Sequence, residues 1–280
     1  MPIKTQFETE DYLRQAALPH WGKTYTVIPH GDIIDHTRAE LALAGFSIFR
    51  ELYKTTQSGE VAQGIYHLNY GNDADMGLMF AWSNSYNKMM KFKCAVGAQV
   101  YICMNGMVSG DLASYARRHS GTALQDAVAS IKTQISNAKE HYDTLIKDKE
   151  MLKKITLSRK QQSAIIGELY ADQEILTVSQ LAVVKREMYV PSLNYNAPAD
   201  SAWSLYNYVT LSLKDSHPMK YLADHQRLHR FFVDQFGTLV TATNPEPTPD
   251  KPKFLEQELP FEKEEVVDLE PSSYNGVLFM

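Results

Sequence analysis

The apolar residues of this chain change their spacing near Gly121, and this change limits the folds available to it. Before Gly121, runs rich in β-branched and aromatic residues are separated by turn segments at 57–59 and 71–73, a pattern typical of β-strands. After Gly121, apolar residues recur in alternating steps of four and three, which is typical of an amphipathic helix. We therefore predict an α+β protein with an antiparallel sheet, a long central helix and a helical C-terminal part.

The same spacing predicts the individual elements. The expected strands are 24–28, 46–55, 60–70, 76–84 and 91–104, and the expected helices are 31–44, 158–170, 177–189, 201–214 and 218–236. Between them, an apolar seam of four heptads predicts one helix over 122–155, opened by a capping box of Thr122 and Gln125. Ser158 and Ser201 are predicted N-caps. A seam of this length suits packing across a sheet or against another subunit, so we expect a homo-oligomer.

The last 37 residues differ in composition from the rest of the chain. They hold six of the twelve prolines, and nine acidic residues against three basic ones. Such a segment cannot bury enough apolar surface to offset the entropy lost on ordering, so we predict a flexible Pro-rich acidic tail over 244–280. The predicted organisation is a sheet region over 1–121, a helical region over 122–243, and this tail.

The tail ends in apolar residues, 277–280, and the middle of the chain is basic. Residues 82–160 carry 13 basic and 6 acidic side chains. An acidic tail with an apolar tip resembles the C-terminal tails of bacterial and phage single-stranded-DNA-binding proteins. There the tail recruits partner proteins and shields a basic nucleic-acid site. We therefore expect replication or recombination proteins as partners, with a merely solubilising appendage as the alternative.

Composition excludes several classes of protein. An apolar fraction of 44% is too high for a disordered chain. The longest apolar run, 94–104, is about half the roughly 20 residues that a membrane span needs, so we expect no membrane association. The first residues lack the basic-then-apolar pattern of a signal peptide. Two cysteines without a CxxC pair favour a reducing compartment, and we expect a cytoplasmic protein.

Catalytic signatures with a known mechanism are missing from the sequence. It contains no GxxxxGK[ST] phosphate loop, no GxGxxG, no GxSxG and no HExxH. His225 and His229 lie four residues apart and would share a helix face, but tetrahedral zinc needs three or four protein ligands. We interpret them as solvated or hydrogen-bonded helix histidines. We predict no catalytic residue, no metal site and no cofactor.

Aromatic and basic residues are crowded together in the segment 80–93 and just downstream. Aromatic faces stack on unpaired bases at about 1–3 kcal/mol each, and cations neutralise backbone phosphates. We predict that seven residues hold a single strand without strong sequence preference: Trp82, Tyr86, Lys88, Lys91, Lys93, Arg117 and Arg118. The alternative is that the rings belong to the sheet core and the lysines to a solvated face.

Three short motifs carry a resemblance to a known family. They are Asn84-Ser85-Tyr86-Asn87-Lys88, a Cys-x-Asn-Gly turn formed by Cys103, Asn105 and Gly106, and Arg118-His119-Ser120-Gly121. With 203–210, they make residues 24–236 resemble the phage- and plasmid-associated domain-of-unknown-function family number 932. That family has no settled activity. Its first motif usually has Asp where this chain has Asn87. If that Asp is catalytic in the family, this chain would have an impaired activity.

The order of the predicted elements is also similar, at the level of the fold, to the single-strand annealing protein superfamily. We therefore expect a phage or plasmid protein that binds single-stranded nucleic acid. The similarity to annealing proteins further implies strand annealing and a role in DNA recombination. A protein-interaction factor without nucleic-acid affinity, such as an inhibitor of a host system, is the alternative. A third alternative is an enzyme, whose site would use side chains of Asn84, Asn87, Cys103, Asn105 or His119.

Overall fold

A seven-stranded antiparallel sheet forms the centre of the structure, which is a computed structural model. The structure describes residues 5–20, 25–101, 105–108, 114–117, 121–214 and 216–241. Of these, only the backbone is described at 5, 105, 114–117 and 238–241. Six strands lie side by side in chain order: β1 (Thr5–Glu8), β2 (Ser47–Thr56), β3 (Val61–Asn69), β4 (Met76–Ser85), β5 (Phe92–Val100) and β6 (Asn105–Val108). The seventh, β7 (Ser114–Arg117), also pairs with β5. The predicted α+β class with an antiparallel sheet is confirmed.

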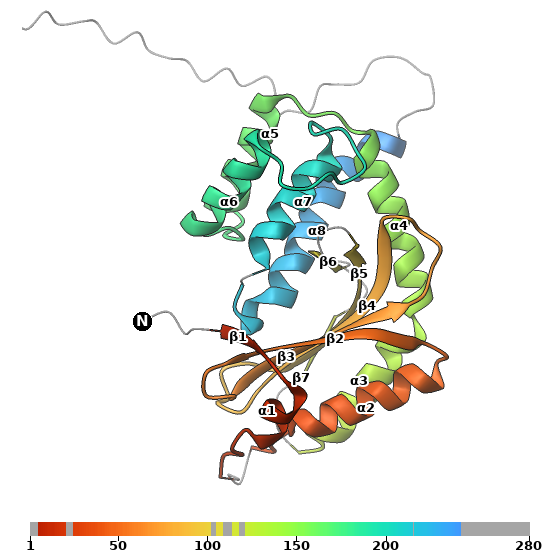
Figure 1. Ribbon diagram of the computed structural model, residues 1–280, viewed down its shortest axis with the longest axis vertical. Helices are drawn as coiled ribbons and strands as arrows, with labels where there is room; N and C mark the ends of the chain where they lie inside the picture. Colours follow the sequence, from red (N-terminus) through yellow and green to blue (C-terminus); the bar gives the residue numbers. More distant parts are fainter. Residues whose placement is uncertain are drawn as a thin grey trace, which may run out of the picture. The chain divides into compact units, whose positions relative to one another are not determined.

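Helices cover both faces of this sheet (Figure 1). In chain order the described helices are α1 (Glu10–Gln15), α2 (His30–Leu43), α3 (Ala123–Ser136), α4 (Ala138–Lys154), α5 (Arg159–Ala171), α6 (Val178–Tyr189), α7 (Ala202–Leu213) and α8 (Pro218–Thr241). The predicted N-caps Ser158 and Ser201 accept hydrogen bonds from the first turns of α5 and α7. Of these helices, none has both the length and the apolar character needed to cross a membrane.

The two faces of the sheet differ in character. One face carries large rings such as Phe80 and Trp82, which join the main core together with residues of α2, α3 and α4. The other face carries Ile65, Met79, Ala81 and Ala95. These smaller side chains pack against Tyr221 and Leu222, in the first turns of α8. All ten residues of β4 are buried, because both of its faces are covered.

The single helix predicted over 122–155 is wrong, because the structure divides it at Asn137, which lies between α3 and α4 with φ −94° and ψ 5°. The predicted capping box is wrong as well. The Thr122 hydroxyl donates to the Asp126 carboxylate at 2.9 Å and makes no bond to the helix backbone.

The apolar seam of these two helices is buried within the chain itself. Six of its apolar members are at most 3% exposed: Ile131, Ile135, Ala138, Tyr142, Leu145 and Leu152. Because α3 and α4 turn this seam toward β5, it is not the surface through which subunits would associate. A homo-oligomer therefore stays a prediction without an assigned interface.

The sheet region and the helical region share one compact unit, Met1–Ala242. Its main core joins Trp82 of the sheet to Ile131 of α3 and Trp203 of α7, so 121/122 does not separate two cores. Of the predicted strand at 24–28, the structure describes 25–28, where Tyr25 is an isolated bridge residue and the next three residues form no strand. The predicted tail, 244–280, lies outside the described residues.

Candidate functional site

The two aromatic residues predicted to stack on bases are buried. Trp82 is 0% exposed, and its Nε1 donates to the Tyr66 hydroxyl at 3.2 Å. Tyr86 is 3% exposed, stacks on the His30 ring with centroids 4.0 Å apart, and accepts a hydrogen bond from the His30 backbone N–H at 2.7 Å. Both rings stabilise the packing around the sheet. Neither presents a face to an unpaired base, so their predicted stacking role is corrected.

Three of the predicted cations, Lys88, Lys91 and Arg117, lie at one end of the sheet. Lys88 and Lys91 are exposed in the loop between β4 and β5. Lys88 adopts a left-handed backbone (φ 64°), and its Nζ lies 4.9 Å from the centroid of the Tyr25 ring. The β5–β7 register places Arg117 opposite Phe92, at the base of that loop. We call residues 86–91 and Arg117 the hairpin end; Arg118 lies outside the described part of the chain.

The family motif at 84–88 closes this hairpin. The Asn84 amide donates to the Ile28 carbonyl at 2.8 Å and contacts the His30 ring at 3.0 Å. The Ser85 hydroxyl donates to the Met90 carbonyl at 3.1 Å and accepts from the Met90 N–H at 3.2 Å. These bonds hold the loop to β4 and to the chain before α2. The motif residues Asn84 and Ser85 therefore have a structural role.

The other motif residues are only partly described. Cys103 and His119 lie outside the described residues, and of Asn105 only the backbone is described, paired with Val100. Gly106 sits under α8, where an added Cβ would come within 2.6 Å of the Tyr221 hydroxyl oxygen. A side chain at this position would therefore have to displace the Tyr221 side chain.

A row of polar residues crosses the sheet on the face that α8 covers. The strand registers pair Lys54 with Gln63, Gln63 with Ser83, and Ser83 with Lys93, so that these four residues lie side by side across β2, β3, β4 and β5. Lys54, Gln63 and Ser83 are 5%, 0% and 1% exposed, and Lys93 is partly exposed. We call this group the polar row. Three of its members were not among the residues that the sequence singled out.

The polar row is charged at its ends and neutral in its middle. Lys54 Nζ donates to the carbonyls of Lys214 and Ser216 at 3.0 and 2.8 Å. The side-chain amide of Gln63 and the hydroxyl of Ser83 make no hydrogen bond. Burial lowers the pKa of Lys93, against the opposing charge of Asp224. The row thus combines two cations with two buried neutral groups that are free to donate and accept.

Asp224 lies on α8 and interacts electrostatically with Lys93 at one end of this row. It is 7% exposed, and burial raises its pKa to about 6, although Lys220, Arg227 and Lys93 all favour the ionised form. A carboxyl group whose pKa is raised by burial is typical of functional sites, although groups that only stabilise a fold can have shifted pKa values too.

The histidine pair of α8 is buried, not solvated. Burial lowers the pKa of His225 to about 4, against the opposing effect of the Gly106 backbone. His229 Nε2 contacts the Asp148 carboxylate of α4 at 3.0 Å, so this histidine is hydrogen-bonded as expected. No cluster of three or more His, Cys, Asp or Glu side chains suited to a metal occurs within the described residues.

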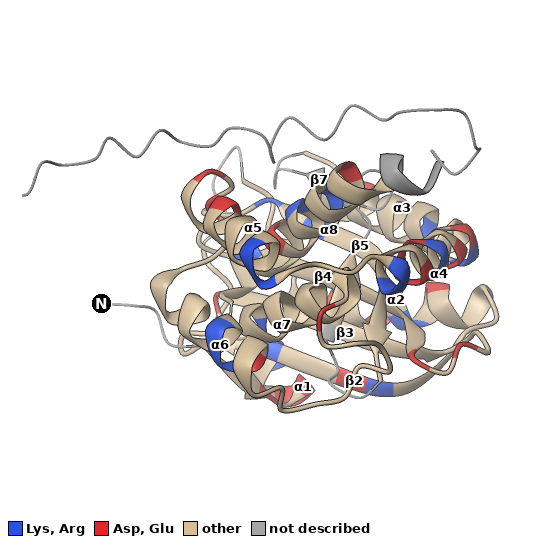
Figure 2. Cartoon of the chain, turned by 90° about the horizontal axis from the view of Figure 1, so that it is seen from above, with Lys and Arg blue, Asp and Glu red and all other residues tan. Residues whose placement is uncertain are grey.

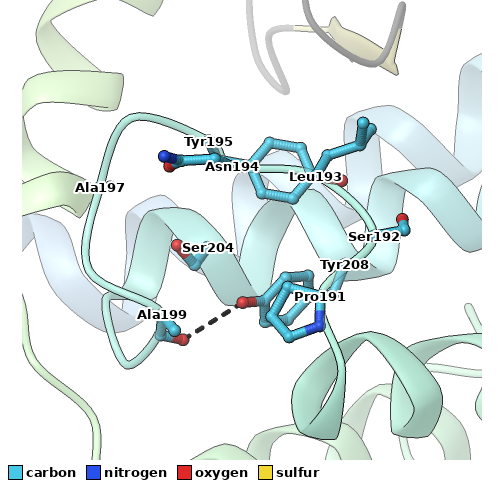
Figure 3. A pocket seen from close by; sticks show the side chains of 9 residues that line it. All are labelled: Pro191, Ser192, Leu193, Asn194, Tyr195, Ala197, Ala199, Ser204 and Tyr208. Carbon is cyan, nitrogen blue, oxygen red and sulfur yellow. Dashed lines mark hydrogen bonds between the residues drawn. The ribbon is translucent and has the colours of Figure 1, made fainter.

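A hollow of about 360 Å³ lies elsewhere, between α7 and the segment 191–199 (Figure 3). Two of its polar side chains bond to the segment that forms its wall. Ser204 Oγ donates to the Pro198 carbonyl at 2.8 Å, and the Tyr208 hydroxyl donates to the Ala199 carbonyl at 3.4 Å, the dashed line of Figure 3. None of the predicted site residues lines this hollow. It is therefore a weaker candidate than the polar row.

Comparison with known proteins identifies a family whose description states no function. No curated protein and no solved structure matches the chain. Residues 17–231 match the family described as Domain of unknown function (DUF932), a range that includes the hairpin end and the whole polar row. Because this match covers more than half of the sequence, the chain belongs to the DUF932 family.

Proposed function

We propose that this protein binds single-stranded nucleic acid, and that the hairpin end holds the strand by its phosphates. The observation that supports this proposal is the β5–β7 register, which brings Arg117 to the base of the loop that exposes Lys88 and Lys91. Cations on one exposed loop can contact successive phosphates of a flexible strand.

The burial of Trp82 and Tyr86 changes the character of the expected binding. Without base stacking, affinity comes from the release of counterions, so it is modest, independent of sequence and steeply dependent on salt. The lysines of α4 add little, because acidic residues lie among them along the helix (Figure 2). We therefore limit the proposal to the hairpin end. Strand annealing stays a further proposal, since it needs two strands to be held at once.

The test is binding of fluorescent oligo-dT at several salt concentrations. Lys88→Gln with Lys91→Gln should weaken binding and reduce the salt slope by about two, since each lysine that contacts a phosphate contributes about one. The matched control is Lys132→Gln with Lys154→Gln, which removes two exposed lysines from α3 and α4. Absence of wild-type binding at low salt, or an equal loss in the control, would end this proposal.

Recognition of a partner protein is the second candidate, and a different surface supports it. Large apolar side chains are exposed on α5, α6 and just after them: Tyr170 (42%), Val178 (70%), Tyr189 (66%) and Val190 (71%). Scattered apolar residues are normal on a surface, but four on one helix pair suit a contact with another protein. Purified protein that carries a bound host protein and no nucleic acid would favour this candidate over the first.

A further inference from the structure

Gln63 and Ser83 lie in the interior with side-chain polar atoms that make no hydrogen bond. Each is at most 1% exposed, and they are neighbours on β3 and β4. Buried polar groups are nearly always hydrogen-bonded to protein or to ordered water. A buried group without such a bond loses its hydrogen bonds to water and gains none in return, which costs free energy. Gln63 and Ser83 lie side by side with a lysine beyond each of them, and a bound molecule could supply the hydrogen bonds that these two side chains lack.

We propose that the polar row is a binding site for a small molecule that carries a phosphate group. A phosphate offers several acceptor oxygens and negative charge. The hydroxyl of Ser83, the amide N–H of Gln63 and the ammonium of Lys93 are the donors that it needs. The carbonyl oxygen of Gln63 and the carboxylate of Asp224 then remain as acceptors. They suit hydroxyl groups on the same ligand, such as those of a sugar phosphate or a nucleotide.

Access to this site is from the Lys93 end. Lys93 is partly exposed, whereas Lys54 is closed in by its bonds to the carbonyls of Lys214 and Ser216, which precede α8. The phosphate group therefore binds near Lys93 and Ser83, and Lys54 holds the segment before α8 in place over the far end. This site is separate from the hairpin end, whose exposed lysines are not part of the polar row.

The experiment measures thermal unfolding of the full chain with inorganic phosphate, with a nucleoside monophosphate and with oligo-dT. Either small ligand should raise the melting temperature of the wild type. Gln63→Leu should abolish this rise and should itself raise the melting temperature without ligand, by about 2–4 °C, because it removes an unmet buried amide. Ser83→Ala, a smaller change, should weaken phosphate binding at least several-fold. The control Lys132→Met removes an exposed lysine of α3 and should respond like the wild type.

The outcomes distinguish a ligand-binding site from a row of polar residues that only stabilises the fold. If neither small ligand stabilises the wild type, the proposal is wrong. It is also wrong if Gln63→Leu lowers the melting temperature without ligand, because the amide would then be satisfied by ordered water. A nucleoside monophosphate that binds more tightly than inorganic phosphate would indicate a nucleotide as the ligand. Loss of the small-ligand response in Gln63→Leu with unchanged oligo-dT binding would show that the two proposals stand independently.

Discussion

At the scale of single residues, Asp224 is a carboxyl group whose ionised form is disfavoured by its burial in the fold. Burial raises its pKa from 3.8 to about 6, so the folded chain holds a proton there more readily than the unfolded chain does. The stability that this proton gives is complete below about pH 4 and is lost as the pH rises through 6. At neutral pH the ionised carboxylate is therefore a cost to folding, retained beside the polar row.

Asp224→Asn should therefore stabilise the protein at neutral pH. We expect the free energy of unfolding at about pH 7.5 to increase on the order of 1–3 kcal/mol, and the gain to vanish near pH 4. Urea unfolding at a series of pH values checks this. The matched control is Asp234→Asn, which neutralises an exposed acid of the same helix. A gain that does not depend on pH would contradict the assignment of the raised pKa to burial.

The residues of the site were only partly predictable from the sequence. Lys88 and Lys91 are exposed, as the binding role predicted for them requires. The burial of Trp82 was only the alternative to stacking on bases, because alternation alone cannot say whether one or both faces of a strand are covered. The polar row could not be predicted from the sequence. Lys54 and Lys93 are 39 positions apart in the chain, and only the strand registers bring them into line.

At the scale of elements, an ion-pair network fastens α4 to the turn before β4. Lys149 is 2% exposed and donates to Asp73 at 2.6 Å and to Asp75 at 3.2 Å; Lys153 also pairs with Asp75. Burial would lower the pKa of Lys149, but the acidic partners outweigh this effect and raise it. The network explains how a lysine can occupy a core-facing position of the apolar seam.

Lys149→Met should destabilise the protein by about 3–5 kcal/mol, because the remaining carboxylates would be left partly buried with less compensation. Chemical denaturation measures the loss. Lys147→Met, at an exposed position two residues earlier on the same helix, serves as the control and should change stability little. Equal effects of the two substitutions would mean that the buried pairs contribute nothing specific.

The elements themselves were largely predictable. The four central strands and the helices from α5 to α8 lie where the spacing placed them, since turn residues and caps such as Ser158 mark their ends. The division at Asn137 was missed because the apolar seam continues through it, from Ile135 to Ala138. The strands β1, β6 and β7 were missed because four residues are too few to show a period.

At the scale of the whole molecule, the +7 middle segment and the −6 tail are joined in one chain. We predict that deleting 244–280 tightens oligo-dT binding several-fold at low salt, because a tethered acidic segment competes with phosphates for the same cations. Titrations of the full and the shortened chain check this. The difference should disappear at high salt, where both interactions are screened. Weaker binding after the deletion would contradict a shielding role for the tail.

The placement of β3 in the middle of the sheet has a consequence for how this family can vary in length. Successive residues of β3 point to opposite faces, so Gln63 and Ile65 face α8 while Tyr66 faces the main core. An insertion of one residue early in β3 would exchange the two faces and bury aromatic rings where the polar row now lies. Relatives that keep this architecture should therefore gain or lose residues in the connections between the strands rather than within β3.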